Sequence, residues 1–277
     1  MTGAPTGGLT GDQLVEQLRM LGVGPDTGVL LVHAALRALG PVAGGSAAVL
    51  AALRTALGPG GTLVAYTATP ENSATSRLHR EATAHLSAEQ RAAHLAAMPP
   101  FDPAATPCSP TVGRLSEELR RTPGARRSAH PQTSFAALGP LAGRLLADHP
   151  YHCHLGERSP LGALYRAGAS VLLLGAPLTS CTAFHLAEYR VPGRPQKRYG
   201  AVVRGRGWVG FDGVDLDDGH FPAMLVDVLP ELKAVTGPVG GGTALLMPLR
   251  PAVDAATEWL AGHPAAAVAG GEMRPNP

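Results

Sequence analysis

The sequence predicts an α/β fold: a single layered domain whose mixed central sheet is flanked by helices, with a polar insertion after the third strand–helix unit. Two observations predict it. Short, mostly apolar runs at residues 29–33, 62–66 and 171–174 have the composition of strands buried on both faces. Segments with helical periodicity and capping signals lie between these runs, and such alternation is typical of layered α/β domains.

Composition, net charge and cysteine count limit the classes of protein to which the chain can belong. The chain has 277 residues, 45% of them hydrophobic, which is enough for a sizeable core, and a net charge of +2. No basic block is present, so we expect no nucleic-acid partner. No apolar run approaches the roughly 18 residues of a membrane span, and residues 1–8 lack the pattern of a secretory signal. Three cysteines without a CxxC pair indicate a reduced, cytoplasmic protein.

Helix and strand signals follow one another along the chain. Thr10 and Gln13 have the spacing of a capping box, which predicts a helix start. β-forming residues on either side of a glycine-rich turn predict a hairpin over 197–211. Residues 123–127 have the composition of a turn and 151–160 that of a loop. The other expected elements are helices over 10–21, 46–57, 111–121, 141–148, 183–190, 221–235 and 251–263, and strands over 134–138 and 243–247 in addition to the three named above.

Residues 67–110 interrupt this alternation. They are polar and contain His79, His85 and His94, whose spacing is not that of metal ligands, so we expect these side chains on the surface. A short helix can begin at Ser87. Long insertions in α/β enzymes commonly form lids or substrate walls. We therefore predict one domain over 1–265, with 67–110 as its insertion or lid and 266–277 as a loose C-terminal tail.

The stretch 171–188 has the strongest functional signal. Its apolar run ends at Gly175-Ala176-Pro177, because proline has no N–H for a sheet ladder. The helix expected next places His185 and Glu188 three residues apart, on one face. Ligands of open α/β sheets bind at the carboxyl ends of strands. An imidazole and a carboxylate delivered to that edge are candidate catalytic groups.

Two other kinds of chemistry deserve comparison. Cys181 lies four residues before His185, so the two could act with Glu188 as a Cys–His–acid triad of an acyl-cysteine enzyme or a thiol hydrolase. Side chains on one helix face point the same way rather than at each other, which argues against this. Adjacent residues crowd one coordination sphere, so we expect no metal at the other cluster of suitable ligands. That cluster is His149, His152, Cys153 and His154.

Several segments, in the same order, resemble motifs of the aminoglycoside 3-N-acetyltransferase family. The run VLLVHAALRALGPVAGGSAAVLAALRTALGPGGTLV is similar to its opening strand–helix–strand unit. The later matches are PPFDP, SPTVGRLSEELRRTPGARRSAHPQTSFAALGPLA, GERSPL and VLLLGAPLTSCTAFHLAEYR. Together they cover roughly residues 10–262. The resemblance implies transfer of acetyl from acetyl-coenzyme A to an amine, the 3-amino group of a 2-deoxystreptamine antibiotic, and hence antibiotic resistance.

The resemblance also implies roles for residues. An ammonium must lose a proton before it attacks a thioester, and an imidazole is a suitable base near neutral pH. We assign the base to His185 and a supporting or amine-binding role to Glu188. Coenzyme A contacts are expected at His33, Ala34, Ala35, Ser109, Thr111, Ser128 and His130. Substrate contacts are expected at Asp102, Glu157 and Tyr66. Another amine-bearing natural product is the alternative acceptor, and a homodimer is compatible with the resemblance.

Overall fold

The structure is a computed structural model that describes residues 8–264. Three parallel strands form its centre, β1 (Val29–Ala34), β2 (Thr62–Tyr66) and β5 (Ser170–Leu174), and β1 pairs with both of the others. Their side chains alternate between two separate hydrophobic clusters, one on each face of the sheet. Since both faces are covered, apolar residues can follow one another without interruption in these strands.

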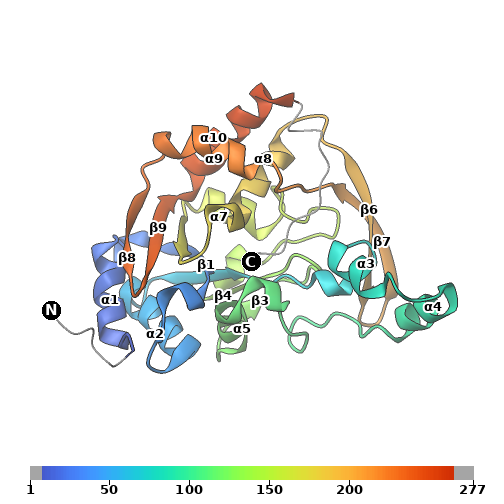
Figure 1. Ribbon diagram of the computed structural model, residues 1–277, viewed down its shortest axis with the longest axis horizontal. Helices are drawn as coiled ribbons and strands as arrows, with labels where there is room; N and C mark the ends of the chain where they lie inside the picture. Colours follow the sequence, from blue (N-terminus) through green and yellow to red (C-terminus); the bar gives the residue numbers. More distant parts are fainter. Residues whose placement is uncertain (1–7, 265–277) are drawn as a thin grey trace.

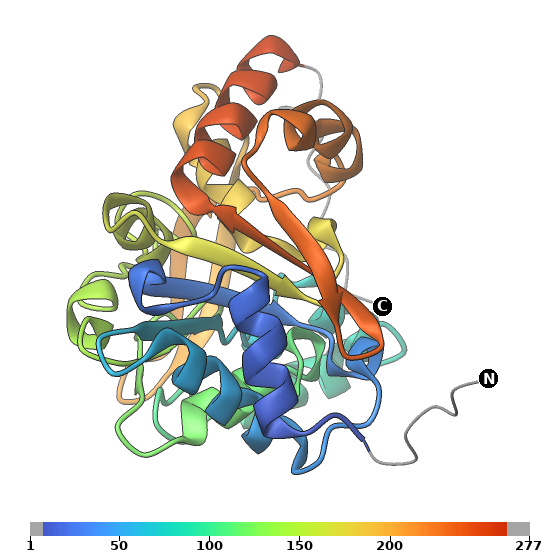
Figure 2. The same cartoon turned by 90° about the vertical axis from the view of Figure 1, so that its left-hand side faces the viewer.

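Antiparallel strands extend the sheet on both sides. β4 (Phe135–Leu138) pairs with β2, and β3 (Arg126–Arg127) pairs with β4. On the other side β9 (Gly242–Pro248) pairs with β5, and β8 (Val235–Val239) pairs with β9. Figure 2 shows the orange β8–β9 pair beside the yellow β5. The strand order is β3-β4-β2-β1-β5-β9-β8, so the predicted mixed sheet is confirmed.

Helices cover both faces (Figure 1). The cluster on one face includes buried residues of α1 (Gly11–Met20), α2 (Gly45–Leu57) and α5 (Arg114–Arg121). The cluster on the other face includes residues of five helices, α6 (Ala142–Leu145), α7 (Pro160–Arg166), α8 (His185–Arg190), α9 (Phe221–Val228) and α10 (Leu249–Gly262). This second layer contains the candidate catalytic helix. None of the helices within residues 8–264 is long and apolar enough to cross a membrane.

The insertion packs against the predicted hairpin. It follows β2 and contains α3 (Arg77–Thr83) and α4 (Ala88–Ala97), and the hairpin consists of β6 (Gln196–Val203) and β7 (Gly207–Val214). Figure 1 places these four elements together at one end of the molecule. Isolated bridges join Ser73 to Ala201 and Phe101 to Val203, and the indole of Trp208 donates to the carbonyl of Leu95. Two segments distant in sequence therefore form one wall.

Several expectations need correction. Residues 126–127, predicted as a turn, form edge strand β3, because their backbone pairs with β4. The helix predicted over 221–235 ends at Val228, a 3₁₀ turn containing Pro230 follows, and β8 begins at Val235. His79 is buried rather than on the surface, and its ring lies beside that of His94. The capping box at Thr10 is confirmed. The tail predicted over 266–277 lies outside the described residues.

Candidate active site

A cavity of about 720 Å³ lies at the carboxyl ends of β1 and β2. Residues from the end of β1, the insertion, the start of α5, the segment after β5 and the hairpin all line it. Its volume lies within the range of pockets that enclose small organic ligands, and its place in the sheet is where such ligands bind in α/β folds. The cavity is therefore the candidate active site.

His185 and Glu188 form a buried pair beside this cavity. The Nδ1 atom of His185 lies 2.5 Å from Oε2 of Glu188. Glu188 is fully buried, while His185 is a cavity-lining residue whose ring also contacts Phe221 at 5.0 Å between centroids. An ionised carboxylate can only accept hydrogen bonds, so Nδ1 carries the ring proton and Nε2 is the basic atom of the ring.

The second oxygen of Glu188 is also occupied. Oε1 accepts hydrogen bonds from the guanidinium of Arg194 and from the backbone N–H of Asp217, the latter at 3.1 Å. The buried carboxylate thus has an opposite charge and several donors, which is the condition under which a charge is tolerated in an interior. Arg194 and Asp217 could not be found from the sequence, because both lie after the end of α8 and only the fold returns them to Glu188.

The end of β1 meets the segment after β5 at this site. Nε2 of His33 lies 3.3 Å from Oγ1 of Thr182. Burial, and then the proximity of His185, lowers the pKa of His33 to about 4, so this imidazole is neutral at pH 7. Ala34 and Ala35 follow His33 along the cavity lining. Three of the residues expected to contact coenzyme A are therefore brought beside the candidate base.

Cys181 does not have the environment of a nucleophile. Its side chain is fully buried, and burial raises the pKa of its thiol to about 12. A cysteine nucleophile acts as the thiolate, which positive neighbours or a base must favour. The opposite environment here argues against the acyl-cysteine alternative.

The other residues expected at the coenzyme A site lie in different places. Thr111 lines the cavity, whereas Ser109 does not, and their hydroxyl oxygens lie 2.8 Å apart. Ser128 is buried against Nδ1 of His149 at 2.9 Å. Nδ1 of His130 accepts the backbone N–H groups of residues 132 and 133. The side chains of Ser128 and His130 are thus used to hold the turn before β4, and neither lines the cavity.

The residues considered for a metal site are not gathered around one point. His149 and His154 are buried, whereas His152 is exposed on the same loop. Within residues 8–264 no group of three or more histidine, cysteine, aspartate or glutamate side chains has an arrangement that could hold a metal ion.

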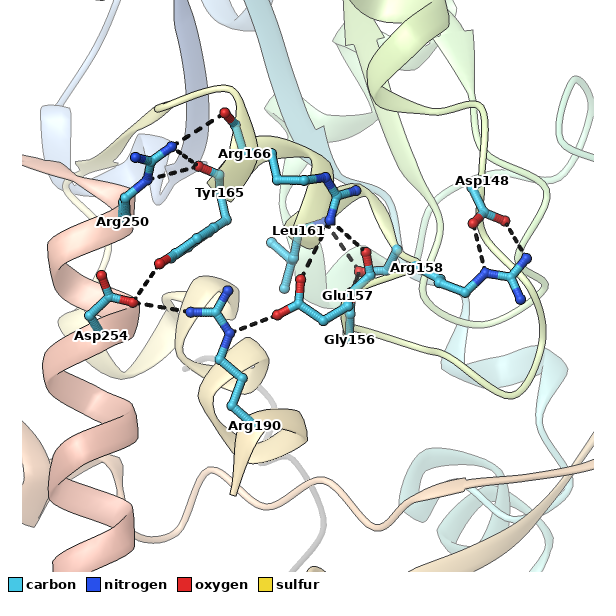
Figure 3. A network of polar contacts seen from close by, with 11 residues as sticks. Asp148, Gly156, Glu157, Arg158, Leu161, Tyr165, Arg166, Arg190, Arg250 and Asp254 are labelled. Atoms are coloured by element: carbon cyan, nitrogen blue, oxygen red, sulfur yellow. Dashed lines mark hydrogen bonds and ion pairs between the residues drawn. The ribbon is translucent and has the colours of Figure 1, made fainter. Parts of the chain in front are cut away.

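Of the three residues expected to contact the substrate, one lines the cavity and two do not. Tyr66 lines the cavity, and its buried hydroxyl has no hydrogen-bond partner among the described residues. Glu157 lies elsewhere: it pairs with Arg166 and Arg190 at the surface (Figure 3). Asp102 accepts the N–H of Ala104 at 2.8 Å and pairs with Arg204. Neither of these two carboxylates lines the cavity.

The charged side chains that do line the cavity are mostly cationic. Asp218 is the one carboxylate among its described lining residues. The acidic run of residues 212–218 is visible in the sequence, but nothing in that run indicates which member reaches a site. The cations of the lining are Arg37, Arg77, Arg114 and Lys197. Arg77 pairs with Glu81 and Lys197 with Asp215, so Arg37 and Arg114 are the lining cations that best suit a co-substrate with several phosphate charges.

A buried His–Glu pair beside a ligand-sized cavity is an arrangement that suits an enzyme with acid–base chemistry. A family profile described as aminoglycoside 3-N-acetyltransferase matches residues 31–261. The chain belongs to this family of acyltransferases, which confirms the predicted resemblance and enzyme class.

Among curated relatives, aminoglycoside N(3)-acetyltransferase III of Salmonella sp. is 44% identical over 187 residues, which are 67% of this chain. The match spans 62% of that relative, less than two thirds of its length. Aminoglycoside N(3)-acetyltransferase VIII of Streptomyces fradiae is 36% identical over 95% of this chain and 96% of its own.

Several solved structures have the same fold as this chain. YokD of Bacillus subtilis superposes with a TM-score of 0.87 at 32% identity, covering 94% of this chain and 96% of its own. A binary complex of AAC-IIIb with CoASH has a TM-score of 0.79 at 31% identity and covers 92% and 97% of the two chains. AAC-VIa bound to sisomicin has a TM-score of 0.80 at 30% identity and covers 92% and 98%.

Proposed function

We propose that the protein transfers acetyl from acetyl-coenzyme A to the 3-amino group of a 2-deoxystreptamine aminoglycoside. The observation that carries the proposal is the buried pair of His185 and Glu188 beside the cavity. Support comes from the family, from a neighbour solved with CoASH and from another solved with sisomicin.

The proposed reaction is a direct transfer. Nε2 of His185 accepts a proton from the acceptor amine as its nitrogen attacks the thioester carbon. A C–N bond forms, the C–S bond then breaks, and the leaving thiolate recovers a proton from the imidazolium. Glu188 keeps the ring in one tautomer and stabilises the imidazolium while it exists. No acyl-enzyme is formed, which agrees with the environment of Cys181.

Binding roles follow from the lining of the cavity. In this proposal His33, Ala34, Ala35 and Thr111 contact coenzyme A, and the cations Arg37 and Arg114 attract its phosphates. Tyr66 and Asp218 are proposed to contact the acceptor. The hydroxyl of Tyr66 can donate to an oxygen of the acceptor, and the carboxylate of Asp218 can bind an ammonium group.

A second acceptor class has its own support. Aminoglycosides carry several ammonium groups, and such ligands favour sites with several carboxylates. The described lining contains one carboxylate, and Asp102 and Glu157 are paired elsewhere, whereas Arg37 and Arg114 add positive charge to the lining. An amine-bearing natural product with fewer positive charges is therefore the alternative substrate of the same chemistry.

The test is thiol release from acetyl-coenzyme A with a panel of aminoglycosides and other amines. We expect turnover with a 2-deoxystreptamine compound and a loss of about 10²–10⁴-fold in kcat for His185→Gln. His152→Gln, at an exposed histidine, is the matched control and should retain wild-type activity. Turnover with other amines alone would support the second acceptor class, and an active His185→Gln enzyme would exclude the proposed base.

A further inference from the structure

We propose that Arg194 is a positioning residue that fixes Glu188 and, by its own positive charge, sets the pH at which His185 can accept a proton. The inference rests on the proposed function, because it concerns the base of that reaction. Arg194 lies between α8 and β6, outside the helix that carries His185 and Glu188.

The contacts place Arg194 on the far side of the carboxylate from the base. Arg194 as a whole is 6% exposed. Its guanidinium donates to Oε1 of Glu188, while Oε2 of Glu188 faces Nδ1 of His185. The backbone N–H of Asp217 shares Oε1. Because both oxygens are held from different directions, the carboxylate cannot rotate away from the ring, and the ring keeps the tautomer that leaves Nε2 basic.

Charge gives Arg194 a second effect. A permanent cation compensates the negative charge of Glu188, so the group of three side chains is neutral when His185 is neutral and carries one positive charge when the ring is protonated. Without Arg194, protonation of the ring would instead neutralise a buried negative charge. Opposite charges within a few ångströms favour the charged form of a base. Loss of Arg194 should therefore make His185 hold its proton up to a higher pH.

Other ionisable groups near His185 come from different elements. His33 faces it from β1 and His220 from the start of α9, and burial lowers the pKa of both rings, to about 4 for His33. Both are therefore neutral at pH 7. The carboxylate of Asp217 accepts the backbone N–H of Gly219 at 2.8 Å. The acidic and basic groups described next to the His185–Glu188 pair are Arg194 and Asp217, and Asp218 and Lys197 line the same cavity as His185.

The variants Arg194→Gln and Arg194→Lys test the proposal. The pH dependence of kcat/KM and the NMR titration of the His185 ring are measured in each. We expect Arg194→Gln to move the acidic limb and the ring titration up by about one pH unit, which is tenfold in proton affinity. Arg194→Lys keeps the charge and should leave both near the wild-type pH.

Arg190→Gln is the matched control. Arg190 is also an arginine that follows Glu188 closely in sequence, but its guanidinium pairs with Glu157 and Asp254 and stacks over the Tyr165 ring (Figure 3). Its removal should leave the pH dependence unchanged. An Arg194→Gln enzyme whose titration stays at the wild-type pH, or moves down, would overturn the proposal.

Two further measurements can still contradict the inference if Arg194→Gln does not fold or no amine is acetylated. If Arg194→Gln does not fold, Glu188→Gln is compared with the double variant Glu188→Gln/Arg194→Met, in which an apolar side chain replaces the buried cation. Removal of the cation should then raise the pH of the ring titration, and no change would contradict the inference. If no amine is acetylated, the proposed function fails, but the ring titration still tests Arg194 in the resting protein.

Discussion

Oε2 of Glu188 lies 2.5 Å from Nδ1 of His185, and this pair is buried in the first turn of α8. Replacing Glu188 by Gln would leave the buried guanidinium of Arg194 without its carboxylate. Breaking a buried ion pair in this way typically costs about 3–5 kcal/mol. We expect Glu188→Gln to lower the free energy of unfolding by about 3 kcal/mol, measured by urea denaturation, and kcat by at least about tenfold.

Glu157→Gln is the same substitution at a half-exposed pair. Exposed ion pairs contribute about 0–1 kcal/mol, so its unfolding free energy should stay within that range of wild type. Equal losses in the two variants would show that burial of the Glu188 site does not strengthen its interactions.

Cys181→Ala separates direct transfer from an acyl-cysteine route. Burial raises the pKa of this thiol to about 12, so the thiolate is scarce at neutral pH. We expect kcat within about threefold of wild type, since the route of transfer does not use the sulfur. The wild-type enzyme should also resist iodoacetamide under native conditions. A loss comparable to that of His185→Gln would instead support the nucleophile.

The sequence was sufficient to predict the central strands and the helix that carries the candidate base. Strands buried on both faces consist of apolar runs, and His185 and Glu188 are close in sequence, so local spacing alone predicts their shared face. Edge strands β3 and β8 were missed because their formation depends on a neighbouring strand, and their composition is not that of a typical strand.

The remainder of the site depends on contacts between distant segments. His33 meets Thr182 across 149 residues, and Asp217 meets Glu188 across 29. The spacing rules for helices and strands relate residues only a few positions apart, so they cannot predict contacts across such sequence separations. Glu157 shows the converse: its motif is local, but the carboxylate pairs with arginines that the fold brings to it at the surface. Side-chain partners in three dimensions, rather than residue type, decide which polar groups reach the cavity.

Asp218→Asn tests the acceptor end of the cavity. Asp218 is the carboxylate among the described lining residues, so its removal should weaken binding of an ammonium group. Hydrogen bonds to charged groups contribute about 1.5–3 kcal/mol, and we expect KM for a polycationic aminoglycoside to rise by at least about tenfold with kcat little changed. Asp102→Asn removes a carboxylate that does not line the cavity and should leave KM unchanged. A KM for Asp218→Asn equal to that of wild type would place acceptor charge recognition elsewhere.

We expect the protein to lose stability in mild acid, because two of its histidines are buried with lowered pKa values. Burial lowers the pKa of His149 to about 4 and that of His154 to about 3, whereas the unfolded chain has the ordinary value of 6.5. The unfolded state therefore binds more protons below pH 6.5. Each histidine contributes stability that is complete above that pH and is lost progressively as the pH falls toward its folded value, by about 1.4 kcal/mol per pH unit.

His149→Gln isolates one of these contributions. Unfolding free energies measured in urea between pH 6.5 and 4.5 should show a slope about 1.4 kcal/mol per pH unit smaller than in wild type, whatever the absolute stability of the variant. His152→Gln removes an exposed histidine from the same loop and should keep the wild-type slope. The slope is the informative quantity, because lost packing and hydrogen bonds shift stability equally at every pH, whereas a lost titration changes how stability varies with pH. An unchanged slope in His149→Gln would mean that this ring titrates alike in the folded and unfolded chains.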